Sequence, residues 1–400
     1  MKNRARGDAR PPGRIWFMFQ QMKWRFVLLL VLAMVVVQGG VYAEEEAGAG
    51  GGKQRLLYVA TPAIRNYLEY GGHGVIVFDI DHGHRFVKRI PLAGLDEKGQ
   101  PRNVKGVAAN AQTRRLYVTT THTLTALDLV TEKILWEKPY EGGCDRLALA
   151  PDGKVIFLPS LEQSHWHVVN ALSGDVIKRI ETHAGAHNTI CALDGKHAFL
   201  AGLKSPLLRV LDTRTYEVSR EVGPFSDFVR PFTVNGAGTR CLVNVNELLG
   251  FEIGDTQTGK MLHRVEVKGF EKGQTKRHGC PSHGIGLTPD EKEIWLTDPH
   301  NRRMHIFDAT KMPPAQVASI EVRDEPGWIT FSIDGKYGYP STGDVIDVGT
   351  RKIVAGLTDE KGAAVQSEKM LEIDFADGKP VRAGDQFGLG RKMGPRIHAN

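Results

Sequence analysis

Three histidines stand out as residues that could carry chemistry. His278 and His283 lie five positions apart in a polar stretch, and His187 lies farther upstream. Imidazole is a common ligand of transition metals, and its pKa near neutrality also allows it to transfer protons. We therefore take His187, His278 and His283 as candidate metal ligands, and His187 and His283 as candidate catalytic residues. The spacing of these histidines does not identify a cofactor. A divalent metal is the candidate cofactor.

A second group of residues could bind a ligand beside these imidazoles. Cations and amides that converge with imidazoles in one funnel would suit an anionic organic molecule or a metal. The alternative is that these residues are polar only because water reaches them. The candidate ligand-binding residues are Lys105, Asp145, Arg146, Asn188, Arg230, Trp328 and Glu247.

Several motifs with a defined chemistry are absent from the sequence. It contains no G-x-S-x-G elbow, no P-loop and no H-E-x-x-H. The four cysteines form no Cys-x-x-Cys, which excludes a zinc ribbon and a covalently attached haem c. In an exported chain they could form up to two disulfides, or they could be buried as small hydrophobic residues. These cysteines are Cys144, Cys191, Cys241 and Cys280.

The net charge of +6 is concentrated at the N-terminus. Residues 1–43 contain seven Lys and Arg residues against Asp8 alone, so residues 44–400 have no net charge. A nucleic-acid partner is therefore not expected, because the remainder lacks the positive field that phosphates require. The apolar content of 41% excludes a disordered chain.

The N-terminal segment has the pattern of a secretory signal. An apolar run of 12 residues from Phe26 to Val37 follows two basic residues and precedes Val-Tyr-Ala. This predicts a signal peptide over residues 1–43, cut after Ala43, with Met22 as an alternative true start. Residues 44–55 would be a flexible linker, and the protein would be periplasmic, cell-surface or secreted. The alternative is an uncleaved anchor, which would bring the protein to the membrane.

The candidate site residues must be positioned by a repeat of about 42 residues. A short strand-like run ending in Asp or Asn recurs at steps of 49, 42, 42, 43, 53 and 39 residues. Each run that ends in Asp or Asn is followed by a second strand-like run and preceded by one or two more. Polar turns separate these runs. The recurring residues are Asp79, Asp128, Asn170, Asp212, Asp255, Asp308 and Asp347.

Each unit therefore has four short strands, a to d, which is the pattern of a propeller blade. The sequence predicts an all-β, seven-bladed β-propeller over residues 56–380 with four antiparallel strands in each blade. The first unit lacks strand a, and the strand-like run from Leu371 to Phe375 is expected to supply it and to close the ring. Six or eight blades are the alternatives. Residues 381–400 would form a C-terminal tail, and we expect a monomer.

The repeats also resemble a known family. The units "RLYVTT…LTALDLVTEKILW" and "APDGKVIFLP…HVVNALSGDVIKRI" are similar to YVTN-type (YncE-like) repeat propellers. More broadly they resemble the cytochrome-d1-type and lactonase-like seven-bladed superfamily. The resemblance implies a propeller exported by bacteria. It does not imply one activity, because enzymes, cofactor binders and adhesins share this repeat.

The two long insertions indicate which face of the propeller is functional. They cover Thr61–Gly74 and Gly269–His283, and both fall on the face formed by the b–c and d–a loops. Residues directly before each strand a should line the channel mouth on this face. We expect the protein to bind a small molecule, a polysaccharide or a protein there.

Two other functions are also compatible with the sequence. One is a lactonase- or lyase-type enzyme, in which Glu247, Asn188 or a histidine holds a divalent cation and His283 or His187 moves a proton. The other is a redox subunit whose channel histidines ligate haem or copper.

Overall fold

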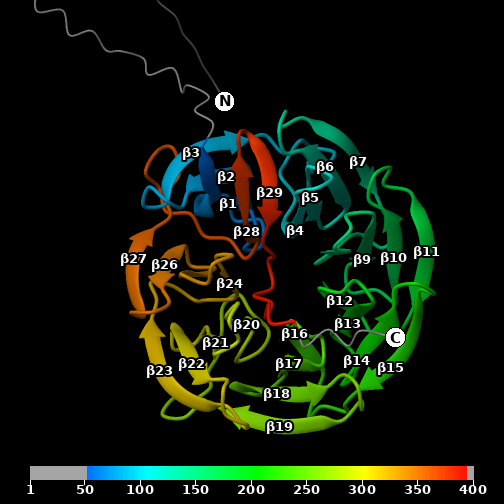
Figure 1. Ribbon diagram of the computed structural model, residues 1–400, viewed down its shortest axis with the longest axis vertical. Coiled ribbons are helices and arrows are strands. Elements are labelled where there is room, and N and C mark those ends of the chain that lie inside the picture. Colours follow the sequence, from blue (N-terminus) through cyan, green and yellow to red (C-terminus); the bar gives the residue numbers. More distant parts are fainter. Residues whose placement is uncertain (1–51, 394–400) are drawn as a thin grey trace, which may run out of the picture. The chain divides into compact units, whose positions relative to one another are not determined.

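The computed structural model describes residues 52–393. These residues form 29 β-strands and a single short 3-10 turn, η1 (Leu68–Tyr70). The strands make seven sheets arranged in a ring (Figure 1). The all-β, seven-bladed propeller is therefore confirmed. No helix within residues 52–393 has the length and apolar character needed to cross a bilayer. The signal peptide and most of the linker lie outside the described residues.

Blades 2 to 7 each consist of four consecutive antiparallel strands, with the first innermost and the last at the rim (Figure 1). Blades 2 to 4 contain β4 (Val104–Asn110), β5 (Arg115–Thr120), β6 (Thr123–Asp128), β7 (Ile134–Pro139), β8 (Ala148–Leu149), β9 (Val155–Pro159), β10 (His165–Asn170), β11 (Val176–Glu181), β12 (Ala186–Cys191), β13 (His197–Gly202), β14 (Leu208–Asp212) and β15 (Glu217–Val222). Blades 5 to 7 contain β16 (Val229–Val234), β17 (Arg240–Val245), β18 (Gly250–Asp255), β19 (Met261–Glu266), β20 (Ile285–Leu287), β21 (Glu293–Asp298), β22 (Arg303–Asp308), β23 (Ala315–Glu321), β24 (Ile329–Phe331), β25 (Tyr337–Pro340), β26 (Asp344–Asp347) and β27 (Lys352–Gly356).

Blade 1 is assembled from both ends of the described chain. Its strands β1 (Lys53–Thr61), β2 (Gly74–Asp79) and β3 (Arg85–Ile90) are joined by β28 (Met370–Ala376), which pairs with β1 from Lys53↔Ala376 to Val59↔Met370. This is the closing strand that the sequence predicts. The first strand begins at Lys53, inside the range that we assigned to the linker.

A fifth strand in blade 1 was not predicted. Strand β29 (Lys379–Ala383) pairs with β28 on its inner side, and the following segment crosses the centre of the ring (Figure 1). There the Gln386 side chain accepts a hydrogen bond from Val107 N at 3.1 Å and donates one to Leu147 O at 3.2 Å. Thr233 Oγ1 donates to Gly388 O at 2.8 Å. The tail therefore closes the channel at the end formed by the a–b turns.

The recurring Asp and Asn residues end strand c in every blade, and their side chains stabilise the turn that follows. In blade 2, Asp128 Oδ1 accepts hydrogen bonds from Val130 N at 2.9 Å and Thr131 N at 2.7 Å. In blade 3, Asn170 Oδ1 accepts the same pair of hydrogen bonds from the two corresponding backbone groups. A short polar side chain at this position replaces the ladder partners that the backbone loses at the turn.

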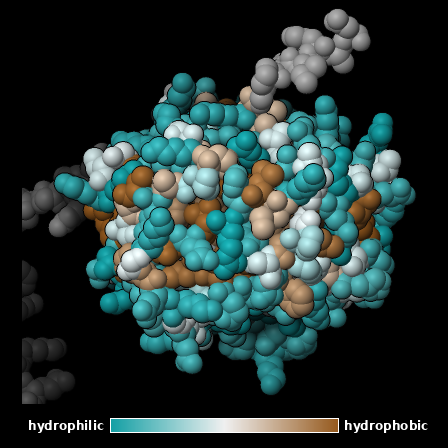
Figure 2. All heavy atoms as spheres, turned by 90° about the horizontal axis from the view of Figure 1, so that it is seen from below, coloured by the Kyte–Doolittle hydropathy of each residue, from teal (hydrophilic) through white to brown (hydrophobic). Residues whose placement is uncertain are grey.

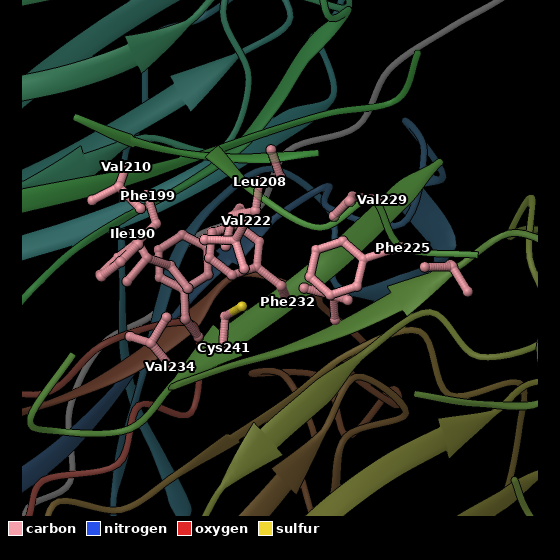
Figure 3. Close-up of a cluster of buried hydrophobic side chains, with 14 of the residues drawn as sticks. Ile190, Phe199, Leu208, Val210, Val222, Phe225, Val229, Phe232, Val234 and Cys241 are labelled. Atoms are coloured by element: carbon pink, nitrogen blue, oxygen red, sulfur yellow. The ribbon is translucent and has the colours of Figure 1, made fainter. Parts of the chain in front are cut away.

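The blades are held together by apolar side chains packed between neighbouring sheets. Figure 3 shows one such cluster between blades 4 and 5, where Phe199, Phe232 and the sulfur of Cys241 lie against one another. Phe199 and Phe232 are each 1% exposed. Burying a side chain of this size contributes about 1.5–3 kcal/mol.

The rim is more polar than these interfaces. Figure 2 shows hydrophobic side chains in separate patches among hydrophilic ones. The exposed hydrophobic residues of the outermost strands include Met261 and Leu262 on β19 and Val354 on β27, which are 39%, 39% and 54% exposed. The outermost strands are thus the most exposed strands of their blades.

Candidate functional site

A polar pocket of about 200 Å³ lies in the channel mouth, at the end opposite the tail. Both insertions border it, the first through Ala63, Ile64 and Arg65 and the second through Arg277 and Gly279. The two insertions also touch each other, because Arg65 Nη2 donates a hydrogen bond to Arg277 O at 3.0 Å. The structure therefore places both long loops beside one pocket.

The propeller itself brings together one residue from each blade. The blades are arranged around a common axis, so the starts of their innermost strands converge at one end of the channel. The residues at these seven positions are Lys105, Arg146, His187, Arg230, His283, Trp328 and Lys369.

On one side of the mouth, Asp145, His187 and Arg146 form a buried chain of hydrogen bonds. His187 Nδ1 donates to Asp145 Oδ2 at 2.7 Å, and Arg146 Nη1 donates to His187 Nε2 at 3.1 Å. Lys105 Nζ lies 3.4 Å from Asp145 Oδ1. Burial would raise the pKa of Asp145, but His187, Lys105 and Arg146 together lower it well below its usual range. Burial lowers the pKa of His187 more than Asp145 raises it, so this imidazole is neutral at pH 7.

On the other side, Glu368 is the buried counter-ion of two cations. Its Oε2 accepts hydrogen bonds from Arg146 Nη2 at 2.5 Å and Lys369 Nζ at 2.8 Å. Both cations lie over the Trp328 ring, at 4.4 Å and 5.0 Å from its centroid. Burial would raise the pKa of Glu368, but Lys369 and Arg146 lower it far below its ordinary value. Burial and the charge of Arg146 lower the pKa of Lys369 to about 7.

The histidine pair His278 and His283 lies against the same carboxylate. The ring centroids are 4.7 Å apart, and His278 Nδ1 is 3.5 Å from Glu368 Oε1. Each of the three residues offers one ligand atom within 4.8 Å of the other two. Burial lowers the pKa of both imidazoles, and for His283 the neighbouring His278 lowers it further. A donor set of two neutral imidazoles and one carboxylate is suited to a divalent metal.

The structure sorts the candidate residues into three groups. Of the sequence candidates, Lys105, Arg146, His187, Arg230, His278 and His283 line the pocket. Asp145, Asn188 and Trp328 are buried behind or beneath the lining. Glu247 does not line it: its side chain is 79% exposed and pairs with Lys272 at 2.8 Å. The binding roles of the lining residues remain predictions.

The proposed set of three histidine ligands is not assembled in the structure. Both ring nitrogens of His187 are engaged by Asp145 and Arg146. His278 and His283 meet Glu368 instead, because the closing strand carries this carboxylate into the mouth.

Sequence reasoning missed Glu368 and Lys369, although a signal for them exists. Residues directly before each innermost strand were expected at the mouth, and β28 was expected to be the innermost strand of blade 1. Applying the same rule to β28 would have selected this pair. Arg277 was missed because its insertion has no periodic pattern; it pairs with Asp324, and its Nε lies 3.5 Å from Glu325 Oε2.

All four cysteines are free and buried, so the disulfides considered from the sequence do not form. Burial raises the pKa of Cys191, Cys241 and Cys280 to about 12 and raises that of Cys144 as well. These thiols are therefore unreactive at neutral pH.

Fold and pocket together define a seven-bladed β-propeller with a polar site in its channel mouth. No protein-family model matches the chain, and no curated protein matches it significantly in sequence. Solved structures do match. The chain is similar to dihydro-heme d1 dehydrogenase NirN in complex with DHE, with 14% identity and a TM-score of 0.56 over 82% of this chain and 72% of that one.

A second similar structure is the β-propeller domain of Cps50 (Swd1) from Myceliophteria thermophila. Its identity is 12% and its TM-score 0.55, over 70% of this chain and 87% of that one. Hydrazine synthase from Kuenenia stuttgartiensis matches 60% of this chain and 92% of its own, with 15% identity and a TM-score of 0.42. At these identities the first two similarities establish the propeller fold and nothing more specific. The third similarity adds nothing to this conclusion.

Proposed function

We propose that this chain is an exported propeller of the YVTN-type (YncE-like) repeat class that binds a small anionic organic molecule in the mouth pocket. The repeats and the N-terminal segment support the class and the export. The pocket supports the ligand, because its volume of about 200 Å³ suits a small molecule better than a polysaccharide or a protein surface.

The observation that carries the proposal is the charge of the lining. Six cationic side chains line the pocket, and two carboxylates, Glu162 and Glu368, face them. Arg277 is neutralised by Asp324 and Glu325, and Asp145 lies behind the lining. These six cations face five carboxylates in all, which leaves one positive charge when Lys369 is protonated. An anion would balance this charge, and the separate lining cations Lys105, Arg146 and Arg230 could each bind one end of a dianion in a site where water screens charges less than it does at a surface.

Arg146 presents a specific donor to such a ligand. Its Nε is buried and has no hydrogen-bond partner within residues 52–393. A buried donor without a partner costs about 1–3 kcal/mol, and a ligand oxygen would satisfy it. The Trp328 ring and the pairs with His187 and Glu368 hold the guanidinium in place. This side chain is therefore pre-organised to donate to an anion.

The test is a calorimetric titration of the purified protein with a small panel of organic molecules. The panel contains C3 to C5 dicarboxylates, the matching monocarboxylates, phosphorylated three-carbon compounds and neutral polyols. The proposal predicts binding of one dianion per chain that is at least about tenfold tighter than binding of the matching monoanion, which corresponds to about 1.4 kcal/mol. Equal binding of the neutral and dianionic molecules would overturn it.

A matched pair of variants locates the site. Lys105→Met removes a lining cation, whereas Lys154→Met removes an exposed cation from the opposite, a–b turn face. The dianion should bind more weakly to the first variant and unchanged to the second. Equal loss in both would show that the binding is nonspecific.

A further inference from the structure

We propose that His278, His283 and Glu368 bind one divalent transition metal ion, with Zn²⁺ as the model, in the wall of the mouth pocket. This proposal does not depend on the anionic organic molecule, since all three metal-coordinating residues belong to the chain. They come from the second insertion, from the start of blade 6 and from the residue pair before β28.

The first support is the orientation of His283. Its Nδ1 donates a hydrogen bond to Gly327 O at 2.8 Å, which leaves Nε2 with a lone pair. Metal-bound histidines usually donate their other ring N–H to a backbone carbonyl or a carboxylate in this way, because that contact fixes the tautomer and the ring plane. His283 is thus already held as a ligand.

The second support is an unsatisfied atom on His278. Its Nε2 is buried and has no hydrogen-bond partner within the described part of the chain, and the residue is 9% exposed. A buried polar atom left unpaired is costly. A metal ion bound to Nε2 would satisfy this atom.

The third support is the space that Gly327 provides. A Cβ at this position would lie 2.1 Å from His278 Cε1 and 2.6 Å from Glu368 Oε1. Glycine is therefore the residue that allows the imidazole and the carboxylate to approach each other. The backbone carbonyl of the same residue holds His283, so one glycine organises all three ligands.

Glu368 can bind in one mode only. Its Oε2 is held by Arg146 and Lys369, so Oε1 is the oxygen that faces the imidazoles. The carboxylate would therefore coordinate the metal through one oxygen. Its two cationic partners would lower the affinity for the metal relative to a site without these cations. Three protein ligands leave a fourth tetrahedral position open, as in zinc sites that bind a water molecule or a substrate oxygen. An anion bound in the pocket could occupy that position.

The experiment is a titration of the full chain with Co²⁺ and then Zn²⁺ at pH 7.5 in a buffer without organic anions. The protein is first treated with a chelator, which is then removed. The expected result is one Co²⁺ per chain with visible absorption typical of a four-coordinate site, displaced by Zn²⁺ in a 1:1 ratio. His283→Asn and His278→Gln should each weaken binding more than about 100-fold, beyond the 10–100-fold that loss of an outer-sphere partner costs.

A matched control comes from a second buried histidine pair in the same molecule. His165 and His167 have the same ring separation of 4.7 Å, and the Nδ1 atoms of both are unpartnered within residues 52–393, but no carboxylate completes a ligand set there. His167→Asn should leave the stoichiometry and affinity unchanged.

Three outcomes would overturn the proposal. They are failure of the unmodified protein to bind Co²⁺ or Zn²⁺, binding that survives both His278→Gln and His283→Asn, and binding that disappears in His167→Asn. Unfolding of each variant is monitored by circular dichroism. If His283→Asn fails to fold, His278→Gln decides the outcome, because His278 belongs to a loop insertion and not to a strand. Failure of metal binding would leave the anion titration unaffected, so the two proposals fail separately.

Discussion

Arg146 and Glu368 form an ion pair across the channel mouth, with Nη2 and Oε2 2.5 Å apart. The two residues are 222 positions apart in the sequence. One precedes the inner strand of blade 3, and the other precedes the strand that closes the ring. The contact therefore links the closure of the fold to the geometry of the candidate site.

Removing one partner of this pair should be costly. Glu368→Gln leaves Arg146 and Lys369 buried without their counter-charge, and we expect it to lower the free energy of unfolding by about 3–5 kcal/mol. The measurement is urea unfolding followed by tryptophan fluorescence. A double-mutant cycle with Arg146→Met should give an interaction energy well above about 0.5 kcal/mol. Independent sites deviate from additivity by no more than about this amount. Additive losses would mean that the pair does not interact in solution.

The closing strand should contribute to stability through its buried side chains. Leu371 on β28 is fully buried between blades 1 and 2, so Leu371→Ala should cost about 2–5 kcal/mol. Val354→Ala on the rim is the control and should cost less than about 0.5 kcal/mol, because Val354 is 54% exposed. Chemical denaturation of both variants checks the prediction. Equal effects would argue against a ring closed by β28.

The tail segment offers a separate test of channel closure. Phe387 is 5% exposed and packs with Trp328 and the cluster between blades 4 and 5. Phe387→Ala should cost about 3–5 kcal/mol in unfolding free energy. Hydrogen exchange should also become faster at Val107 N, which Gln386 holds. Unchanged exchange at that amide would show that the tail does not occupy the channel in solution.

Acid should destabilise the mouth. Burial lowers the pKa of His187 from its ordinary value of 6.5, so its stabilising contribution is fully present above pH 6.5 and is lost as the pH falls through the lower folded-state pKa. Asp145 adds to this loss at still lower pH because its pKa is also depressed, although burial opposes that shift. Urea unfolding between pH 7.5 and 4 should therefore show falling stability, with a shallower slope in His187→Gln. A slope that is identical in the variant would contradict this origin.

Much of the fold could be predicted from the sequence, because its signals are local and repeated. Asp128 and Asn170 mark the ends of the third strands through short-range hydrogen bonds, and the alternation of Leu371 to Phe375 identifies the closing strand. Strand β29 could not be predicted, since "KPVRA" has little apolar alternation and pairs only because β28 offers a free inner edge.

The site was only partly predictable, for a physical reason. The ring brings residues from seven blades to one place, so the list of mouth positions follows from the repeat. Which side chains pair with one another depends on distances across the channel that no local pattern encodes. His187 was therefore grouped with the metal candidates, whereas its partners are Asp145 and Arg146. Glu247 has a suitable carboxylate, but its side chain points into solvent.

The most direct test of the proposed function is a crystal structure of the protein grown with a saturating dicarboxylate. We predict density for the ligand in the mouth pocket, with a carboxylate oxygen about 2.7–3.2 Å from Arg146 Nε and a second carboxylate near Lys105 or Arg230. A pocket that contains only water, or a dicarboxylate bound elsewhere on the propeller, would contradict it.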